Sequence, residues 1–383
     1  MPEPLHTVNE RLRFIAARQA DLYSMTELCE RAGISRETGY KWERRYAEFG
    51  ADGLKPRSHA PHHCPHLIEP HVAELLLDAR RAHPTWGPRK ILPWLARRHP
   101  ELAGELPAAS TAGDLFKRSG LVAAVRRRRS PVHRAAKAVV PDEPNQSWAA
   151  DYKGDFRTLD GHRCHPLTIT DLWSRALLLC DALRSVSFEE ARPSWVRCFR
   201  ENGLPERIRT DNGPPFAASS LLGLTQLNAW WAKLGIEHER IEPGHPEQNG
   251  SHERMHKTLK RETTLKPGQD QAAQQAIFDP WREEFVHERP HEALGQRTPG
   301  SIYVRSAREM PERIPEPEYE PHWLMRRVRG TGTIKFRGRE IFLSEVLERE
   351  TVALEEVDDG VWSIHFYERL IARWCERTGA VSN

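Results

Sequence analysis

The sequence predicts a multidomain protein, with all-α units at its N-terminal end, a central α/β domain built on a mixed sheet, and a small β-barrel at its C-terminal end. Three observations predict this arrangement. Helical apolar spacing with helix-capping residues dominates the chain before residue 122. From Ser147 short apolar runs alternate with helix-length amphipathic segments. Past Pro315 alternating strands are separated by glycine-containing turns. With 383 residues the chain is too long for one compact domain.

The first helical unit has the pattern of a helix, a turn and a second helix. Residues 25–46 predict a short helix, a tight turn at Gly33 and a second helix that begins after an N-cap at Ser35. This pattern resembles a helix-turn-helix, in which exposed side chains of the second helix meet the base edges of DNA. Arg36 and Lys41 are then DNA-binding residues. Any other small helical hairpin fits the pattern equally well, and a glycine inside the second helix departs from it.

A loop rich in proline and histidine, residues 54–66, separates this unit from a second helical stretch. Three helices are predicted there, over residues 71–83, 85–98 and 110–119. Because short helices joined by tight turns recur, this layout permits a second helix-turn-helix.

Positive charge is unevenly distributed, although the net charge is only +3. Four arginines in a row, Arg126, Arg127, Arg128 and Arg129, follow the second helical stretch. Such a run is usually a solvated linker. A flexible basic linker can also follow a phosphate backbone, so these four residues are candidate DNA contacts.

The central segment predicts an α/β domain. Residues 147–156 and 165–183 predict strands that form an antiparallel hairpin around a turn at Gly161. Three strands are followed by helix, strand, helix, strand and helix, an order that resembles the ribonuclease H-like fold. The later elements are expected at 188–202 (helix), 207–211 (strand), 221–234 (helix), 236–241 (strand) and 248–265 (helix).

Three carboxylates stand in this segment at positions suited to metal-dependent chemistry: Asp151 on the first strand, Asp211 at a strand end and Glu253 early in the last helix. Cutting a phosphodiester needs an activated oxygen nucleophile and a stabilised leaving oxygen, and two Mg²⁺ ions held by a few carboxylates supply both. With 54 acidic residues, however, chance triples are common and spacing alone is weak evidence. Asp155 and Asp171 lie near the same site and are not assigned a catalytic role.

The contexts of the three acids resemble a known family. WAADYKG, IRTDNGPPF and PGHPEQNGSHERMHKTLKRE are similar to the acidic blocks of the integrase-core (DDE) transposases of bacterial insertion sequences, which are related to retroviral integrases. FVHERPHEALGQRTPGSIY is similar to the tail of that core, and the outer units fit the family's architecture. One departure is that 41 residues, 212 to 252, separate Asp211 from Glu253, more than in retroviral integrases. We expect the extra residues in the stretch AASSLLGLTQLNAWW, where a longer loop need not move the acids.

The resemblance implies a DDE-type two-metal-ion polynucleotidyl transferase, in which Asp151, Asp211 and Glu253 bind two Mg²⁺ or Mn²⁺ ions. The implied function is that of an insertion-sequence transposase, which cleaves the 3' ends of transposon DNA and transfers them to target DNA, with no covalent protein–DNA intermediate. Two alternatives stay open. One is a DNA-binding regulator that has lost catalysis, against which the three intact acids count. The other is a structure-specific nuclease that cuts without joining.

Two further pairs of residues have both a structural and a DNA-contacting interpretation. Lys257 and Lys260 recur at helical spacing from Glu253 and share its face. An ordinary solvated Glu–Lys pair would explain this spacing, but the resemblance favours contacts from the lysines to the phosphates of the bound DNA end. Trp230 and Trp231 are expected to pack in the core of the domain rather than to stack on a base.

The sequence therefore predicts five segments: a helix-turn-helix DNA-binding domain (1–56), a second helical DNA-binding domain (66–123), a basic linker (124–141), a ribonuclease H-like integrase catalytic core (142–305) and a small SH3-like β-barrel (320–380). The expected partners are DNA, both terminal inverted repeats and target, and further copies of the chain in a dimer or larger assembly. No apolar run approaches the roughly 18 residues that cross a bilayer, so we expect no membrane association and a cytoplasmic, nucleoid-associated bacterial protein.

Overall fold

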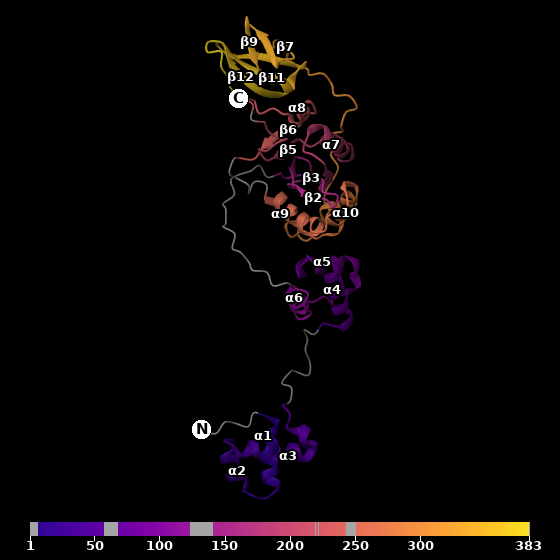
Figure 1. Cartoon of the computed structure of the whole chain (residues 1–383), viewed down its shortest axis with the longest axis vertical. Helices are drawn as coiled ribbons and strands as arrows, with labels where there is room; N and C mark the ends of the chain where they lie inside the picture. The colour runs from indigo at the N-terminus through magenta and orange to yellow at the C-terminus, as the bar shows by residue number, and fades with distance from the viewer. Residues whose placement is uncertain are drawn as a thin grey trace. The chain divides into compact units, whose positions relative to one another are not determined.

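The computed structural model describes residues 7–56, 68–122, 141–218, 220, 222–242 and 250–382. The chain divides into two compact units, one ending at Leu67 and one beginning at Ile68 (Figure 1). Over the described ranges, no helix is both long and apolar enough to cross a membrane. Arg126, Arg127, Arg128 and Arg129 lie outside the described residues, as does the predicted basic linker apart from residue 141.

The first unit is a small helical domain. Its elements are α1 (Val8–Gln19), α2 (Met25–Arg31), α3 (Arg36–Phe49) and the 3-10 turn η1 (Gly50–Leu54). The predicted helix, turn and helix are confirmed, with Gly33 at a positive φ of 62° between α2 and α3. The Oγ of Ser35 caps α3 by accepting a hydrogen bond from the Thr38 amide at 3.2 Å. Phe14, Ile15 and Leu28 are among its buried apolar side chains.

Gly39 lies where α2 and α3 pack together, which explains the glycine inside the second helix. A Cβ at this position would lie 2.6 Å from the Sγ of Cys29 and 2.8 Å from the Sδ of Met25. Both of these side chains are buried in α2. The two helices therefore approach closely because residue 39 has no side chain.

The second unit begins with three helices, α4 (Pro70–Ala82), α5 (Pro88–Arg98) and α6 (Ala109–Arg118), at the places that the sequence predicted. A proline occupies the first position of both α4 and α5, where its missing N–H costs nothing. The helices bury a shared apolar core that includes Trp86 and Phe116. The guanidinium of Arg80 donates to the carbonyl oxygens of Trp86 and Leu121. These bonds link α4 to the connection between α4 and α5 and to the residues that follow α6.

A six-stranded mixed sheet follows, as predicted. Its strands are β1 (Ser147–Tyr152), β2 (Phe156–Arg157), β3 (Arg163–Asp171), β4 (Leu177–Leu183), β5 (Arg207–Thr210) and β6 (Glu237–Arg240). β1 pairs with β3 antiparallel and with β5 parallel, β5 pairs with β6 parallel, and β4 pairs with β3 antiparallel. The predicted turn at Gly161 joins β2 to β3, and the second predicted strand stretch divides into β3 and β4.

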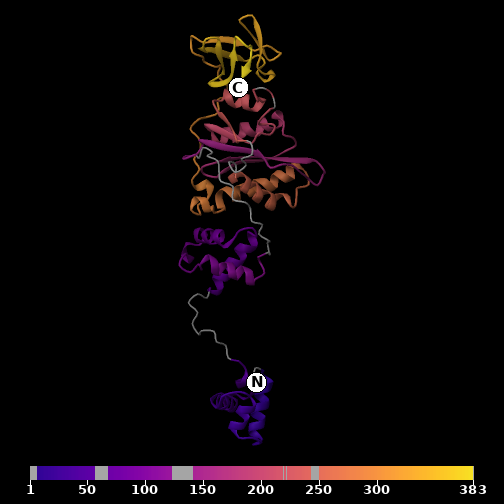
Figure 2. The same cartoon turned by 90° about the vertical axis from the view of Figure 1, so that its left-hand side faces the viewer.

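Helices cover both faces of this sheet. They are α7 (Phe188–Asn202), α8 (Gln226–Lys233), α9 (Gly250–Leu259) and α10 (Gln271–Glu283). Figure 2 shows the sheet edge-on, with α7 and α8 on one side and α9 and α10 on the other. Trp195, Trp230 and Trp231 are buried on the side of α7 and α8, so the interpretation of Trp230 and Trp231 as core residues is confirmed. Met255, Leu259 and Phe278 fill the opposite side.

Two helices of this domain, α8 and α9, differ from the predicted helices. α8 begins at Gln226 rather than at 221, because Leu222 and Leu224 leave the helix and join the apolar core of the C-terminal unit. The extra residues between Asp211 and Glu253 are therefore used partly for packing between domains. α9 continues without a break into a π-helical turn, η4 (Lys260–Thr264), so the long predicted helix is one helix with a widened last turn.

The C-terminal unit is a β structure whose strand pairings do not close into a barrel. Its strands are β7 (Leu324–Arg327), β8 (Thr333–Phe336), β9 (Arg339–Phe342), β10 (Thr351–Asp358), β11 (Val361–Phe366), β12 (Arg369–Cys375) and β13 (Val381–Ser382). They form a five-stranded sheet in the order β13-β12-β11-β10-β7 and a separate pair, β8-β9. The prediction of a small β-barrel is not confirmed, because no hydrogen-bonded ladder joins these two sheets among the described residues.

Candidate active site

Asp151 and Asp211 come from neighbouring parallel strands. In the pairing of β1 with β5, Ser147 lies opposite Arg207 and Ala149 lies opposite Arg209. Continuing this register by two residues places Asp211, which directly follows β5, beside Asp151. Neighbouring strands lie about 4.8 Å apart, so the two carboxylates meet at the carboxyl end of the parallel strands. Asp211 is held by its turn, in which the Gly213 amide donates to Oδ1 of Asp211 at 3.1 Å.

Glu253 reaches the same place from the first turn of α9. The residues on either side of it in helical spacing, His252 and His256, are buried and face β3, whereas Glu253 is only partly buried. The helix is amphipathic, and the face that carries its apolar residues and the two histidines packs on the sheet, which sets the orientation of the helix. The three predicted acids are thereby brought together from a strand, a strand end and a helix.

The electrostatics of Asp151 reflect this convergence. Burial and, to a smaller extent, the nearby carboxylates of Asp211 and Glu253 together raise its pKa to about 7. The amide of Tyr152 and the charge of Lys153 act in the opposite direction but do not offset these effects. A buried carboxylate beside two others is a site of concentrated negative charge, which a bound cation would relieve.

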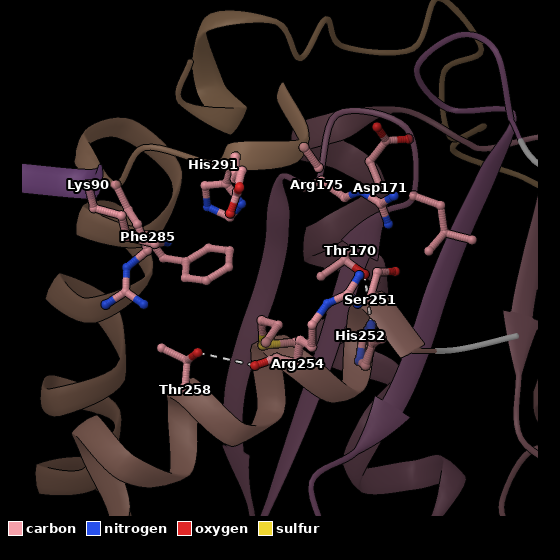
Figure 3. Close-up of a pocket in the computed structure, with 15 residues that line it drawn as sticks. Lys90, Thr170, Asp171, Arg175, Ser251, His252, Arg254, Thr258, Phe285 and His291 are labelled. Atoms are coloured by element: carbon pink, nitrogen blue, oxygen red, sulfur yellow. Dashed lines mark hydrogen bonds between the residues drawn. The ribbon is translucent and has the colours of Figure 1, made fainter. Parts of the chain in front are cut away.

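A chain of hydrogen bonds from β3 to α9 lies directly behind Asp151. Thr168, the residue opposite Asp151 in the β1–β3 pairing, has its Oγ1 2.8 Å from Nε2 of His252 and 2.6 Å from Nε2 of His256. Its hydroxyl donates to the backbone oxygen of Asp151 at 3.1 Å. The other nitrogen of His252, Nδ1, lies 2.7 Å from Oγ1 of Thr170, a contact visible in Figure 3.

These partners assign the tautomers of the two imidazoles. Burial lowers the pKa of His256 to about 2 and that of His252 to about 3, so both are neutral. A threonine hydroxyl donates one hydrogen bond, and Thr168 donates its own to a carbonyl, so both histidines donate to it from Nε2. The Nδ1 of His256 is then an unprotonated nitrogen, and it lies 3.6 Å from Oδ2 of Asp151.

The donor set fits a divalent cation. Three carboxylates from separate elements offer the hard oxygen ligands that Mg²⁺ and Mn²⁺ prefer. Asp151, His252 and His256 also place one ligand atom each within 4.8 Å of one another. His252 is unsuited to this role because both of its nitrogens are already hydrogen-bonded to threonines. His256 has Nδ1 free to join Asp151 at a metal, and a nitrogen ligand suits Mn²⁺ better than Mg²⁺.

The remaining predicted site residues lie on exposed surfaces. Lys257 in α9 and Lys260 in the π-helical turn are exposed and follow Glu253 along one helix. Arg36 and Lys41 are exposed on α3 of the first unit, as a DNA-reading helix requires. Contacts with DNA are proposals for all four of these residues.

The two acids left out of the catalytic set have structural partners. Asp155 pairs with Arg163 at 2.9 Å on the surface. Asp171 is buried, and its carboxylate accepts hydrogen bonds from the amides of Asn145 and Ser174 at 2.9 and 2.7 Å. Asp171 therefore shapes the turn between β3 and β4.

Thr168, His252 and His256 were not predicted from the sequence as residues of the site. Signals for them were present: the histidines stand four residues apart around Glu253, and Thr168 and Thr170 alternate with Leu167 and Ile169. Such spacing puts each pair on one face of its element. It does not reveal that the two faces meet.

Comparisons with known proteins agree with this architecture. Residues 141–246 and 234–299 each match a family described as Integrase core domain. Residues 10–62 match the family Helix-turn-helix domain, and residues 38–113 match the family Homeodomain-like domain.

Two similar proteins come from insertion elements. The "insertion element IS476 uncharacterized 39.2 kDa protein" of Xanthomonas euvesicatoria is 27% identical over 272 residues, which are 68% of this chain and 72% of that protein. The "insertion element IS407 uncharacterized 31.7 kDa protein" of Burkholderia multivorans is 27% identical over 199 residues, 50% of this chain and 67% of that protein.

Solved structures similar to the chain include retroviral integrases. The HTLV-2 integrase catalytic core domain in complex with magnesium covers 43% of this chain and 99% of its own, at 15% identity and a TM-score of 0.34. The simian T-cell lymphotropic virus intasome covers 72% of this chain and 97% of its own, at 18% identity and a TM-score of 0.37. Residues 141–299 thus match integrase-core families and residues 10–113 match helix-turn-helix and homeodomain-like families, and the chain is similar to proteins of bacterial insertion elements.

Proposed function

We propose that the chain is the transposase of an insertion sequence, a polynucleotidyl transferase that cleaves the 3' ends of its element and joins them to target DNA. The observation that carries the proposal is the convergence of Asp151, Asp211 and Glu253, where burial and the two neighbouring carboxylates together raise the pKa of Asp151 to about 7. The integrase-core match over the same residues and the insertion-element relatives support it.

In the proposed mechanism Asp151, Asp211 and Glu253 hold two divalent ions, Mg²⁺ or Mn²⁺. When bound, these would activate the attacking oxygen and stabilise the leaving oxygen of an in-line displacement. Thr168 holds the backbone oxygen of Asp151 and also contacts His256, whose Nδ1 lies 3.6 Å from the Asp151 carboxylate. In the first step the oxygen of water bonds to phosphorus and the bond from phosphorus to the 3' oxygen breaks, which leaves a 3' hydroxyl and a 5' phosphate. In the second step the oxygen of that 3' hydroxyl bonds to a phosphorus of the target strand and the target's own 3' oxygen leaves as a hydroxyl. Each step therefore forms one P–O bond and breaks one.

The helical units would position the DNA. Arg36 and Lys41 on α3 are proposed to contact the terminal inverted repeats, together with Arg126, Arg127, Arg128 and Arg129. Lys257 and Lys260 would contact phosphates next to the cleaved bond. Joining two ends to one target requires at least two copies of the active site, so the working assembly is proposed to be a dimer or larger.

A strand-transfer assay tests the proposal. Purified chain, labelled DNA carrying the ends of its element, and a plasmid target are incubated with Mg²⁺ or Mn²⁺. We expect joined product from the wild type, none from Asp211→Asn or Glu253→Gln, and wild-type yield from Asp155→Asn, which changes a nearby acid engaged with Arg163. Sequence-specific binding without cleavage would instead identify a regulator, and cleavage without joining a nuclease; either result would overturn the proposal.

A further inference from the structure

A cavity of about 600 Å³ opens where α5 of the second helical unit meets the integrase core (Figure 3). It lies against the N-terminal turn of α9, because Ser251, His252 and Arg254 line it while Glu253, between them in sequence, belongs to the acidic site. The helix rises about 1.5 Å per residue, so the cavity and the acidic site are immediate neighbours. None of the proposed steps uses it.

Three cations line this cavity from separate elements, and the nearest carboxylates act on two of them through charge alone: Asp171 on Arg175, and Glu262 and Glu292 on Lys90. Lys90 comes from α5, Arg175 from the turn between β3 and β4, and Arg254 from α9. In Figure 3 Lys90 lies at the left, and Arg175 and Arg254 lie nearer the centre, beyond Phe285 and His291. Among the described residues, no hydrogen bond or ion pair joins any of the three to a carboxylate, even though two carboxylates line the same cavity.

Those two carboxylates are engaged elsewhere. Asp171 accepts hydrogen bonds from the Asn145 amide and from the amide and hydroxyl of Ser174. Glu292 pairs with Arg89 at 3.2 Å. The fourth cation of the cavity, Arg289, is also neutralised, because its guanidinium bonds to Glu262 at 2.5 Å. The excess positive charge therefore resides on Lys90, Arg175 and Arg254.

The other cations of α5 differ from Lys90 in their hydrogen bonds. Arg89, Arg97 and Arg98 each bond to an acceptor of the core: Arg97 reaches the backbone oxygen of Glu288 at 2.8 Å, and Arg98 its carboxylate at 2.9 Å. Lys90, on the same helix, does not. Burial and, to a smaller extent, the positive charge of Arg289 together lower the pKa of Lys90 to about 8, although Glu262 and Glu292 act in the opposite direction. Lys90 and Arg175 are partly buried, each beside another cation, and such a pair of like charges is stabilised when an anion binds next to it.

Arg175 occupies a backbone conformation that would suit glycine better. Its φ is +64°, in the left-handed region, which costs a residue with a side chain roughly 1 kcal/mol. Burial also lowers the pKa of its guanidinium, and the neighbouring charge of Arg254 acts in the same direction. The left-handed backbone and the burial of a positive charge are thus both unfavourable at Arg175, whose side chain lines the cavity.

We infer that this cavity binds a phosphate of the DNA strand that enters the acidic site, held by Lys90, Arg175 and Arg254. Arginine recognises phosphate oxygens through parallel N–H donors, and lysine adds a point charge. DNA is favoured over a free phosphate because one wall is α5 of a helical unit proposed to hold DNA and another is the helix that carries Glu253. The inference rests on the proposed function and adds to it a phosphate pocket at the seam between the two domains.

The test measures binding in chains that cannot cut. All chains carry Asp211→Asn, and affinity for a labelled duplex with the end of the element is measured over a range of salt concentrations. We expect Arg175→Gly and Arg254→Gln each to weaken binding several-fold and to lower the slope of log K against log salt by about 1. Arg192→Gln, an exposed arginine of α7, is the matched control and should bind like the parent. Arg175→Gly should not lower the melting temperature, because it relieves the left-handed residue.

Methylphosphonate scanning locates the contact, since it replaces one charged phosphate by a neutral group of similar shape. At one position near the cleaved bond the substitution should weaken binding about tenfold in the parent and have little effect in Arg254→Gln, the signature of a shared interaction. Parent-like affinity and salt slope in both arginine variants would overturn the inference. So would stabilisation of the parent by pyrophosphate that Arg175→Gly abolishes while DNA affinity is unchanged, because the pocket would then take free phosphate.

These results separate the pocket from the proposed function because no cleavage is involved. A chain with arginine-dependent DNA binding that never yields joined product would contradict the transposase proposal and leave the pocket standing. A chain that joins DNA while its arginine variants bind like the parent would contradict the pocket alone.

Discussion

Nδ1 of His256 lies 3.6 Å from Oδ2 of Asp151, with no proton on the histidine nitrogen to join them. The opposite nitrogen of the imidazole donates to Thr168, the residue that faces Asp151 across the β1–β3 pairing. Two acceptors in this position need a positive charge between them or a proton on the carboxylate. A cation held by Asp151, as proposed above, would supply this charge, and we propose Thr168 and His256 as the positioning residues of that carboxylate.

Thr168→Val should slow DNA cleavage by about tenfold and raise the metal concentration needed for half-maximal rate, since partners behind a ligand typically contribute 10- to 100-fold. The valine keeps the shape but removes the hydroxyl to which both histidines donate. Single-turnover rates against Mg²⁺ concentration measure the effect. Thr168→Ser restores the hydroxyl and should recover most of the rate; equal metal dependence in all three chains would contradict the positioning role.

Asp151→Asn should stabilise the metal-free protein increasingly as pH rises. The ordinary pKa of 3.8 is raised to about 7 in the folded protein, so between these values the folded state holds a proton that the unfolded state has released. The wild type therefore loses stability as pH rises through this window, whereas the uncharged asparagine does not. Melting temperatures from pH 5 to pH 8 measure the difference, which should widen up to about pH 7 and then stay constant.

Metal supplies the control for this experiment. A divalent cation that binds only the folded protein should raise the melting temperature of the wild type at pH 8 and have much less effect on Asp151→Asn. A difference between the two chains that does not change with pH would show that Asp151 titrates normally. The electrostatic convergence proposed for the active site would then be wrong.

Lys257→Gln and Lys260→Gln should each weaken binding of element-end DNA a few-fold and reduce the salt slope by about 1, because each loses one phosphate contact. Both lysines are exposed on the helix that carries Glu253. Lys266→Gln, an exposed lysine beyond the π-helical turn, is the matched control. Equilibrium binding in the Asp211→Asn background measures the three variants together, and identical losses in all three would indicate a general charge effect rather than two specific contacts.

Gly39→Ala should destabilise the first unit by about 1–3 kcal/mol, although alanine ordinarily favours a helix. The added Cβ would lie 2.6 Å from the Sγ of Cys29, so α2 and α3 must separate. Gly113→Ala in α6 is the control, because its Cβ would meet only Pro88 at 3.5 Å, an ordinary contact. Thermal unfolding should show a loss for the first variant and a small gain or no change for the second. Equal stability of the two variants would contradict the close packing of α2 and α3.

Much of the fold could be predicted from the sequence because it depends on local patterns. The turn at Gly33 with the cap at Ser35, and the helix at 188–202, follow from capping and periodicity that act within a few residues. The motifs around Asp151, Asp211 and Glu253 were recognisable for the same reason. The start of α8 was mispredicted because Leu222 and Leu224 are drawn into the core of a domain more than a hundred residues later.

The sequence by itself determined the order of the elements, the three acids and the lysines that follow Glu253, since each is written in a short stretch of chain. Only the tertiary structure decided which side chains surround those acids. Thr168 and His256 are 88 positions apart, and Lys90 and Arg254 come from different domains, yet strand register and helix packing bring each pair to one site. The pKa of Asp151 and the excess charge of the cavity depend on burial and on such neighbours. These are properties of three-dimensional proximity that residue types and spacing do not contain.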